Sequence, residues 1–138
     1  MNPILKNILA VVAGIVAGSI VNMAIIMLSS HLVLPPQGID TSTMEGLKEA
    51  LPLFEPKHFL MPFLAHAIGT LVGAYITVLL AASHKMTFAF VVGCFFLLGG
   101  ITNVILLPSP TWFTVLDLVV AYLPMAWLGG KLGFRPSN

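Results

Sequence analysis

The chain has 138 residues, of which 58% are hydrophobic and only 8% are charged. Soluble domains are typically about 45–50% apolar and about 25% charged, so this chain has too few polar side chains to cover a water-soluble fold of its size. The composition excludes an ordinary soluble enzyme and a disordered chain, and a formal net charge of +1 offers no basic face for a nucleic acid. We therefore expect an all-α membrane protein with the lipid bilayer as its main partner.

Four windows of the sequence are apolar enough to cross a bilayer, whose hydrocarbon core of about 30 Å takes about 20 helical residues. From the N-terminus they cover residues 6–30, 59–83, 86–107 and 111–130. The first window is much longer than the apolar part of a signal peptide, so we expect it to remain in the protein as a span. The chain is thus predicted to be a single membrane domain, a four-transmembrane-helix bundle.

The longest connection, residues 31–58, contains most of the charged residues. Within it, Ser42 and Glu45 have the spacing of a capping box, in which each side chain binds the backbone of the other residue. Leu47 and Leu51 follow with helical spacing. This pattern predicts a short amphipathic helix over about residues 43–51, lying on the membrane surface.

Two prolines shape the fourth window. Pro110 follows Ser109, so we expect Ser109 to cap the helix and Pro110 to occupy its first position. Pro124 lies inside the window and has no backbone N–H for the Val120 carbonyl. A kink is therefore predicted at Pro124, which serves either as a hinge or as a packing adjustment.

Basic residues are divided unequally between the two ends of the predicted bundle. One end would carry Lys6, Lys85, Lys131 and Arg135. The other end would carry Lys48 and Lys57 together with Asp40, Glu45, Glu49 and Glu55. Because Lys and Arg concentrate on the cytoplasmic side, we expect a multi-pass protein of the plasma or inner membrane, with both termini in the cytoplasm and the 31–58 loop outside.

Each predicted span carries one strongly polar side chain, and the four are Asn22, His66, Asn103 and Asp117. At about 1.5 Å per residue, Asn22 and Asn103 lie about 25 Å above the cytoplasmic ends of their helices. His66 and Asp117 lie about 9 Å below the external ends of theirs. We therefore predict one polar layer in the outer third of the bilayer, which forms a binding site.

Small residues accompany these polar groups on the same helix faces, as expected for faces that pack closely inside a bundle. The predicted inward faces are Ala10, Gly14, Gly18 and Asn22; His66, Thr70, Gly73 and Thr77; Gly93, Gly100 and Asn103; and Thr114, Asp117, Ala121, Pro124 and Leu128. Thr70, Thr114 and Pro124 are expected to support the site.

Asp117 needs a hydrogen-bond donor because an unpaired carboxylate in a bilayer is costly, and His66 is the one titratable partner predicted at its level. Asn22 and Asn103 would complete the hydrogen bonds. Taken alone, the two asparagines fit interhelical hydrogen bonding of about 0.6 kcal/mol each better than a functional role. The His66–Asp117 pair fits a functional site and a structural pair equally well.

A short internal repeat links the two halves of the sequence. Gly18-Ser-Ile-Val-Asn22 and Gly99-Gly-Ile-Thr-Asn103 share the pattern G-x-I-x-N, and the helix after each contains His66 or Asp117. Such a pattern is typical of two helical hairpins related by an axis along the membrane normal, as in transporters with parallel repeats.

Metal and cofactor chemistry has little support in the sequence. His31 and His58 flank a loop that holds Asp40, Glu45 and Glu55, and imidazole with carboxylate suits zinc. The residues lack any known ligand spacing, so we expect a solvated loop, no metal and no cofactor.

Three functions remain open. The first is a small transporter or channel-like protein, or a subunit of one, which would form a homo-oligomer because four short helices rarely enclose a complete pathway. The second is a non-catalytic accessory or assembly subunit of a larger membrane complex. The third and last is a membrane-embedded enzyme that uses His66 and Asp117 as an acid–base pair on a lipid or quinone. No catalytic residue is assigned.

Overall fold

The computed structural model describes residues 1–134, where 81% of the chain is helical and no strand occurs. The predicted all-α four-helix bundle is confirmed, and four helices are long and apolar enough to cross a membrane. In chain order the elements are α1 (Pro3–Leu32), α2 (Met44–Ala50), the 3-10 turn Leu51–Leu53, α3 (Pro56–Leu80), α4 (Lys85–Leu106), α5 (Thr111–Val120) and α6 (Leu123–Gly133). Helices α5 and α6 together form the fourth span.

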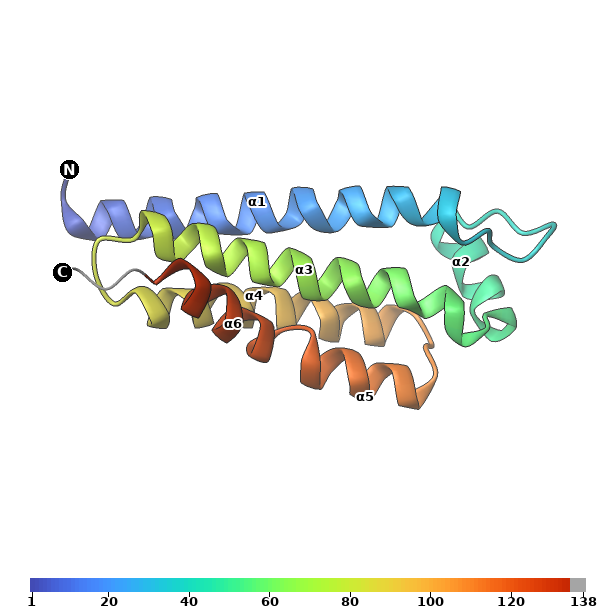
Figure 1. The fold of residues 1–138 in the computed structure, drawn as a ribbon. Coiled ribbons are helices and arrows are strands. Elements are labelled where there is room, and N and C mark those ends of the chain that lie inside the picture. The colour runs from blue at the N-terminus through green and yellow to red at the C-terminus, as the bar shows by residue number, and fades with distance from the viewer. Residues whose placement is uncertain (135–138) are drawn as a thin grey trace.

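The start of α1, the end of α6 and the α3–α4 turn lie at one end of the bundle, and α2 lies at the other (Figure 1). We call these the terminal end and the α2 end. At the terminal end, Asn7 of α1 is buried and holds the α3–α4 turn. Its Oδ1 accepts hydrogen bonds from the backbone N–H of Ala82 (2.8 Å) and Ser83 (3.3 Å), and its Nδ2 donates to Ser83 Oγ (3.1 Å). The first and third helices of the fold are therefore tied together before the chain turns back.

Helices α1 and α3 touch through glycines along the terminal half of the bundle. A Cβ atom at Gly14 would lie 2.5 Å from the Gly73 carbonyl oxygen, and one at Gly69 would lie 2.9 Å from the Gly18 carbonyl oxygen. Any larger residue would push the two backbones apart. Ala10, Gly14 and Gly18 are all buried, so this part of the predicted small-residue face does point inward.

Helix α6 closes the terminal half from the other side. Gly129 lies against the backbone of Leu71 on α3, and Gly133 lies against Tyr75. Ala126 packs on Gly93 of α4. Three of the four spans thus meet through residues with little or no side chain, which permits the close packing seen at this end.

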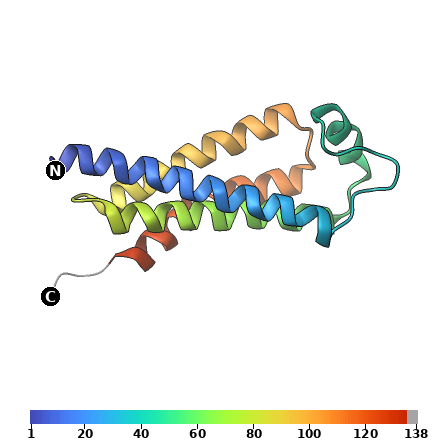
Figure 2. The same cartoon turned by 90° about the horizontal axis from the view of Figure 1, so that it is seen from above.

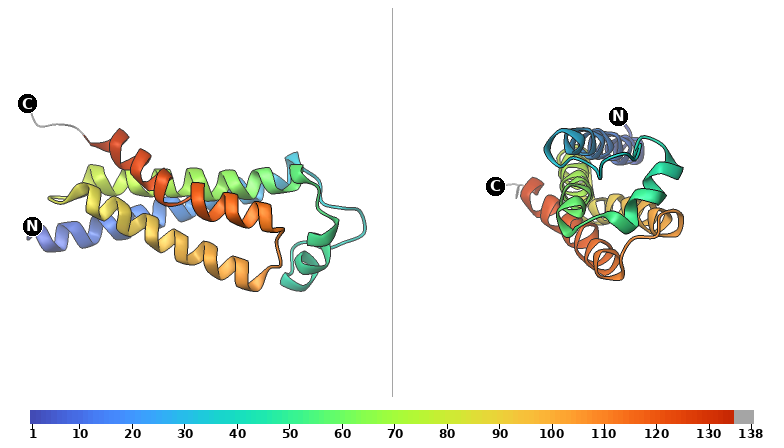
Figure 3. Two further views of the ribbon diagram at one scale, coloured as in Figure 1. Left: turned by 90° about the horizontal axis from the view of Figure 1, so that it is seen from below. Right: turned by 90° about the vertical axis from the view of Figure 1, so that its right-hand side faces the viewer.

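The helices diverge toward the α2 end. Helix α4 leans away from α1 and α3 along its length (Figures 2 and 3). Viewed from this end, α2 and the 3-10 turn lie across the opening between the helices (Figure 3, right). The bundle is therefore packed tightly in one half and spread in the other.

The fourth span is broken at Ala121 and Tyr122, and the break changes which side chains point inward. Pro124 and Leu128 were predicted to face the interior with Asp117, but both are exposed. Ala126, Gly129, Gly130 and Gly133 are buried instead. In an unbroken helix Asp117 and Ala126 would be separated by about 900°, which places them on opposite faces. The break at Ala121–Tyr122 brings both inside.

The caps of two helices also differ from prediction. Thr43, not Ser42, caps α2, because the Thr43 hydroxyl accepts the Gly46 N–H (3.1 Å) while Ser42 Oγ donates to Asp40 Oδ1 (2.6 Å). Helix α5 begins at Thr111, so Pro110 is its N-cap residue and not its first helical residue as predicted. No side chain caps this helix, so Ser109 does not have its predicted role either.

Helix α3 begins three residues before the predicted position because Pro56 occupies its first turn. Glu55 and His58 cap this helix reciprocally, and the His58 Nδ1 accepts the backbone N–H of Glu55 (2.9 Å). Pro62 lies inside this helix.

Candidate functional site

A chamber of about 340 Å³ lies inside the spread half of the bundle. Its wall includes all four residues of the predicted polar layer, which are Asn22, His66, Asn103 and Asp117. Ser109 and Thr114 add two hydroxyl groups. The remaining wall is apolar and comes from every helix of the fold except α6. The structure therefore brings the polar side chains of four helices to the wall of one pocket, while their role in binding stays a prediction.

His66 and Asp117 meet at the deep end of this chamber. His66 Nδ1 lies 2.8 Å from Oδ1 and 2.9 Å from Oδ2 of Asp117. Asp117 is only 3% exposed. With an ionised Asp117, whose oxygens can only accept, the proton of this hydrogen bond lies on His66 Nδ1. In a neutral imidazole the other nitrogen, Nε2, is then an acceptor.

Tyr122 is the third member of this cluster, and the sequence reasoning missed it. Its hydroxyl donates to Asp117 Oδ2 (3.0 Å), and its ring stacks on His66 with centroids 5.7 Å apart. Tyr122 is 2% exposed. In a continuous helix, five residues turn the chain by about 500°, which would point Tyr122 away from Asp117. Pro124, two residues later, was the available signal, because it places the helix break beside Tyr122.

Asn22 and Asn103 do not complete the hydrogen bonds of Asp117, contrary to the expectation. Within residues 1–134 neither side-chain amide has a hydrogen-bond partner, and Tyr122 takes their expected place. Asn22 is half-buried, with its Cβ against Gly69 of α3. Asn103 is exposed at the edge of the chamber. The two amides therefore lie on its wall with their donors and acceptors unused.

The three supporting residues have different fates. Thr114 lines the chamber, as its predicted face requires. Thr70 is fully buried one turn below His66 but does not line the chamber, and its hydroxyl has no partner within the described chain. Pro124 points outward and acts only through the break in the backbone.

On the terminal side of the chamber, the Phe96 side chain packs across the interior of the bundle. The Phe96 ring lies against Gly18 of α1 and Gly73 of α3, and it packs on the buried cluster of Ala67, Ala121 and Tyr122. Large side chains thus fill the interior below the His66–Asp117 pair. In this conformation the chamber is closed toward the terminal end.

The α2 end of the chamber is covered by a small hydrophobic cluster. Leu51, Phe59 and Phe113 are buried together, and Phe54 and Leu107 pack against them. His58 holds this cover in place, because its ring stacks on Phe54 (centroids 4.9 Å apart). The charged residues of α2 point away from the chamber, as an amphipathic helix requires.

His58 therefore has a structural role in place of the metal site considered above. Besides capping α3 through Nδ1, its Nε2 lies 3.2 Å from the Leu34 carbonyl oxygen and so ties down the loop after α1. His31 Nδ1 lies near the Met27 carbonyl oxygen instead (3.3 Å). Within residues 1–134, no group of three or more His, Cys, Asp or Glu side chains is placed to hold a metal ion.

The two copies of the G-x-I-x-N repeat pack differently. A side chain at Gly18 would collide with Gly69 and Phe96, whereas Gly99 faces open space. Asn22 and Asn103 nevertheless line the same chamber. The repeat thus places two equivalent amides around one volume without giving its two glycines the same contacts.

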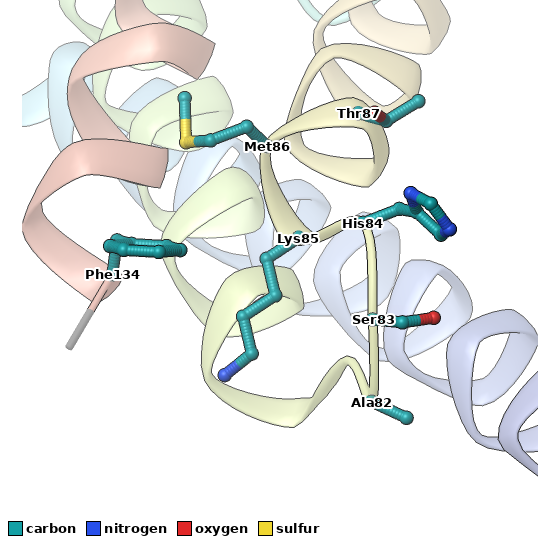
Figure 4. A pocket seen from close by; sticks show the side chains of 7 residues that line it. All are labelled: Ala82, Ser83, His84, Lys85, Met86, Thr87 and Phe134. Atoms are coloured by element: carbon teal, nitrogen blue, oxygen red, sulfur yellow. The ribbon is translucent and has the colours of Figure 1, made fainter. Parts of the chain in front are cut away.

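A second hollow, of about 410 Å³, lies at the terminal end around the α3–α4 turn. Lys85, Met86 and Phe134 lie on one side of this turn, while His84 and Thr87 point to the other (Figure 4). The polar groups of this hollow do not converge on one point. It is therefore a weaker candidate for a binding site than the chamber, although its volume is larger.

Comparison of the chain with family models, curated proteins and solved structures finds no match.

Proposed function

We propose that this chain is a multi-pass membrane protein that binds a small molecule in the chamber and works as a transporter-like protein or as a subunit of one. Support for the bilayer comes from the outside of the bundle. Ile20, Leu98 and Ile105 are 64%, 65% and 78% exposed, and similar apolar side chains cover the outer faces of all four spans. Such a large apolar surface is unfavourable in water, whereas it suits the hydrocarbon core of a bilayer.

The distribution of charge supports an orientation with the terminal end in the cytoplasm. Lys6, Lys85 and Lys131 are at this end, and Arg135 lies outside the described residues. The α2 end carries four acidic and two basic residues. The positive-inside rule then places the chamber in the outer half of the bilayer, beneath α2.

The orientation can be tested with single cysteines. Cys94 is first replaced by alanine, and a cysteine is then introduced by Glu49→Cys on α2 or by Lys85→Cys at the α3–α4 turn. A membrane-impermeant maleimide added to intact cells is expected to label the first variant and to spare the second. The reverse pattern, or labelling of both, contradicts the proposed topology.

The broken fourth span carries the proposal of a transport-like function. Substrate sites in secondary transporters are typically formed by discontinuous helices near polar groups in the membrane. Here the break at Ala121–Tyr122 brings Asp117 and Tyr122 to His66 at the floor of a chamber that is closed on one side. Because a single copy has no continuous path, movement of a solute across the membrane requires a rearrangement, a homo-oligomer or a larger complex.

Flux measurements test this proposal. The protein is reconstituted in proteoliposomes and a panel of small solutes is screened, with and without a proton gradient. Flux of at least one solute is expected, and His66→Gln and Asp117→Asn are expected to abolish it. His84→Gln and Asp40→Asn are matched controls, since both residues lie outside the chamber. The absence of any flux that depends on His66 and Asp117 contradicts the proposal.

One observation favours acid–base catalysis as a second candidate. A carboxylate on Nδ1 leaves Nε2 of His66 as the reactive nitrogen, which is the arrangement of a histidine general base. Turnover of a lipid or quinol that is lost in His66→Gln, while no solute is transported, would favour this candidate.

A further inference from the structure

Several polar groups of the chamber have no protein partner. Within residues 1–134, the amides of Asn22 and Asn103, the side-chain hydroxyls of Ser109 and Thr114, and Nε2 of His66 make no hydrogen bond. These atoms are not sealed in the core, because the one fully buried side-chain atom without a partner is Thr70 Oγ1, outside the chamber. A molecule in the chamber therefore meets unused donors and acceptors at its deep end and its edge.

The other walls of the chamber are hydrophobic. Leu47, Leu51 and Phe54 cover it from the α2 side, and Phe59, Val104 and Phe113 line its flanks. A volume of about 340 Å³ is at the low end of the range of about 300–1,000 Å³ that is typical of small-molecule sites. The space therefore suits a slender apolar molecule with a small polar head.

The charges around the chamber argue that this head is uncharged. No Lys or Arg lines it, so an anionic head would lack a permanent cation. Asp117 is the one carboxylate of the wall, but its oxygens already accept from His66 and Tyr122. A cationic head would have to displace these two donors. A hydroxyl group instead donates to His66 Nε2 and accepts from an asparagine amide, which matches what the chamber leaves unused.

The chamber reaches the outer surface of the bundle between α1 and α4. These helices meet where Gly18 lies against the Phe96 ring, and they diverge from there toward the α2 end (Figure 2). Ile26 of α1 and Asn103 of α4 both line the chamber, and both are also exposed. In the proposed orientation this side faces lipid, whereas α2 covers the side that faces water.

From these observations we infer that the chamber binds a single-chain amphiphile with an uncharged, hydroxylated head, which reaches it from the bilayer between α1 and α4. This inference rests on the proposed function, since it names the ligand class of the same chamber. The head would lie against His66, and the chain would lie along the apolar wall toward α4.

Photolabelling in lipid nanodiscs tests the inference directly. The probe is 1-decanol with a diazirine on its chain, and the labelled peptides are identified by mass spectrometry. Label is expected on α4 and α5 peptides that contain chamber residues, and unlabelled 1-decanol is expected to compete. Decane and glycerol, which match only the tail or only the head, should not compete.

Matched variants on one helix separate binding from general partition into lipid. Val104→Trp fills the chamber and is expected to abolish competable labelling, whereas Ile105→Trp, on the exposed face, leaves it unchanged. His66→Leu removes the proposed acceptor for the head and should weaken competition by 1-decanol about tenfold. Melting temperatures close to that of the parent protein show that the variants are folded.

Two results would overturn the inference. Equal labelling in Val104→Trp, or competition by decane, means that the probe samples only the lipid surface. Labelling of the chamber by a glycerol-based probe that 1-decanol does not displace means that the ligand is hydrophilic and enters from water. If the ligand is hydrophilic, a flux that depends on His66 can still be observed. The proposed function is then supported, and only the proposed ligand class is contradicted. If 1-decanol competes for binding but no flux is observed, the ligand class is supported and the transport-like function is contradicted.

Discussion

The terminal half and the α2 half of this bundle use the same four helices in opposite ways. In the terminal half, glycines on α1, α3 and α6 allow neighbouring backbones to touch. In the α2 half, aromatic rings and a short covering helix surround a chamber in which the amides of Asn22 and Asn103 have no hydrogen-bond partner within residues 1–134. A small helical bundle can thus keep an open volume in one half while close backbone packing holds the helices together in the other.

The largest expected effect is a loss of stability from a substitution in the closely packed terminal half. In Gly14→Leu the new side chain collides with Thr77 and the Gly73 carbonyl group, so we expect a loss of about 3 kcal/mol in the free energy of unfolding. Gly99→Leu is the matched control, because nothing lies within 4 Å of a Cβ atom there. Denaturant unfolding in mild detergent measures both. Similar losses in the two variants would show that the glycine contacts do not hold this half together.

The next effect concerns the boundary between the halves. Asp117→Leu removes the acceptor shared by His66 and Tyr122 and leaves both donors without a partner, which should cost about 1–2 kcal/mol. Tyr122→Phe removes one of these hydrogen bonds and keeps the ring on His66, so about 0.6 kcal/mol is expected. Unfolding in lipid nanodiscs measures both losses. A larger loss for Tyr122→Phe than for Asp117→Leu would contradict the central place given to the carboxylate.

A smaller effect concerns the cover of the chamber. His58→Ala removes the cap of α3, the tie to Leu34 and the stacking on Phe54. We expect about 1 kcal/mol of local destabilisation, which hydrogen exchange would detect as faster exchange in residues 54–60. Exchange in the α1–α3 contact of the terminal half should not change. Uniformly faster exchange along α3 would mean that the two halves are not separable.

The smallest effect lies in the exposed loop before α2. Hydrogen bonds from the side chain and the backbone of Ser42 hold the pKa of Asp40 below its usual value of 3.8. Because the pKa is lower in the folded loop, these bonds stabilise the loop above pH 4 and are lost as the pH falls through the lowered pKa. Ser42→Ala is expected to raise the Asp40 pKa, as followed by NMR titration, without altering the chamber. An unchanged pKa would show that the loop turn does not depend on Ser42.

Apolar windows were sufficient to predict the fold, and helix rise led to a polar layer whose four residues do line one chamber. Asn22, His66, Asn103 and Asp117 are far apart in the sequence, yet the length of each span fixes their heights. The spacing of small residues also predicted the inward face of α1, because a stripe of small residues lets two helix backbones approach closely.

The missed features are those that depend on local backbone geometry. Pro124 signalled a disturbance in the fourth span, but a proline does not specify how far the chain rotates there, and this rotation decides that Tyr122, not an asparagine, binds Asp117. Asn7 was overlooked because its partners, Ala82 and Ser83, are backbone and side-chain groups of a turn remote in sequence. The cap at Thr43 replaces the predicted Ser42 because the Ser42 hydroxyl donates to Asp40 instead.

The interruption at Ala121–Tyr122 lets the fourth long helical segment bury two sets of residues that a continuous helix would place on opposite faces. An uninterrupted fourth span has one inner stripe, so it could bury either the carboxylate of Asp117 or the small residues of α6, never both. Because α5 and α6 are offset from each other, the same segment buries Asp117 on α5 and the small residues of α6.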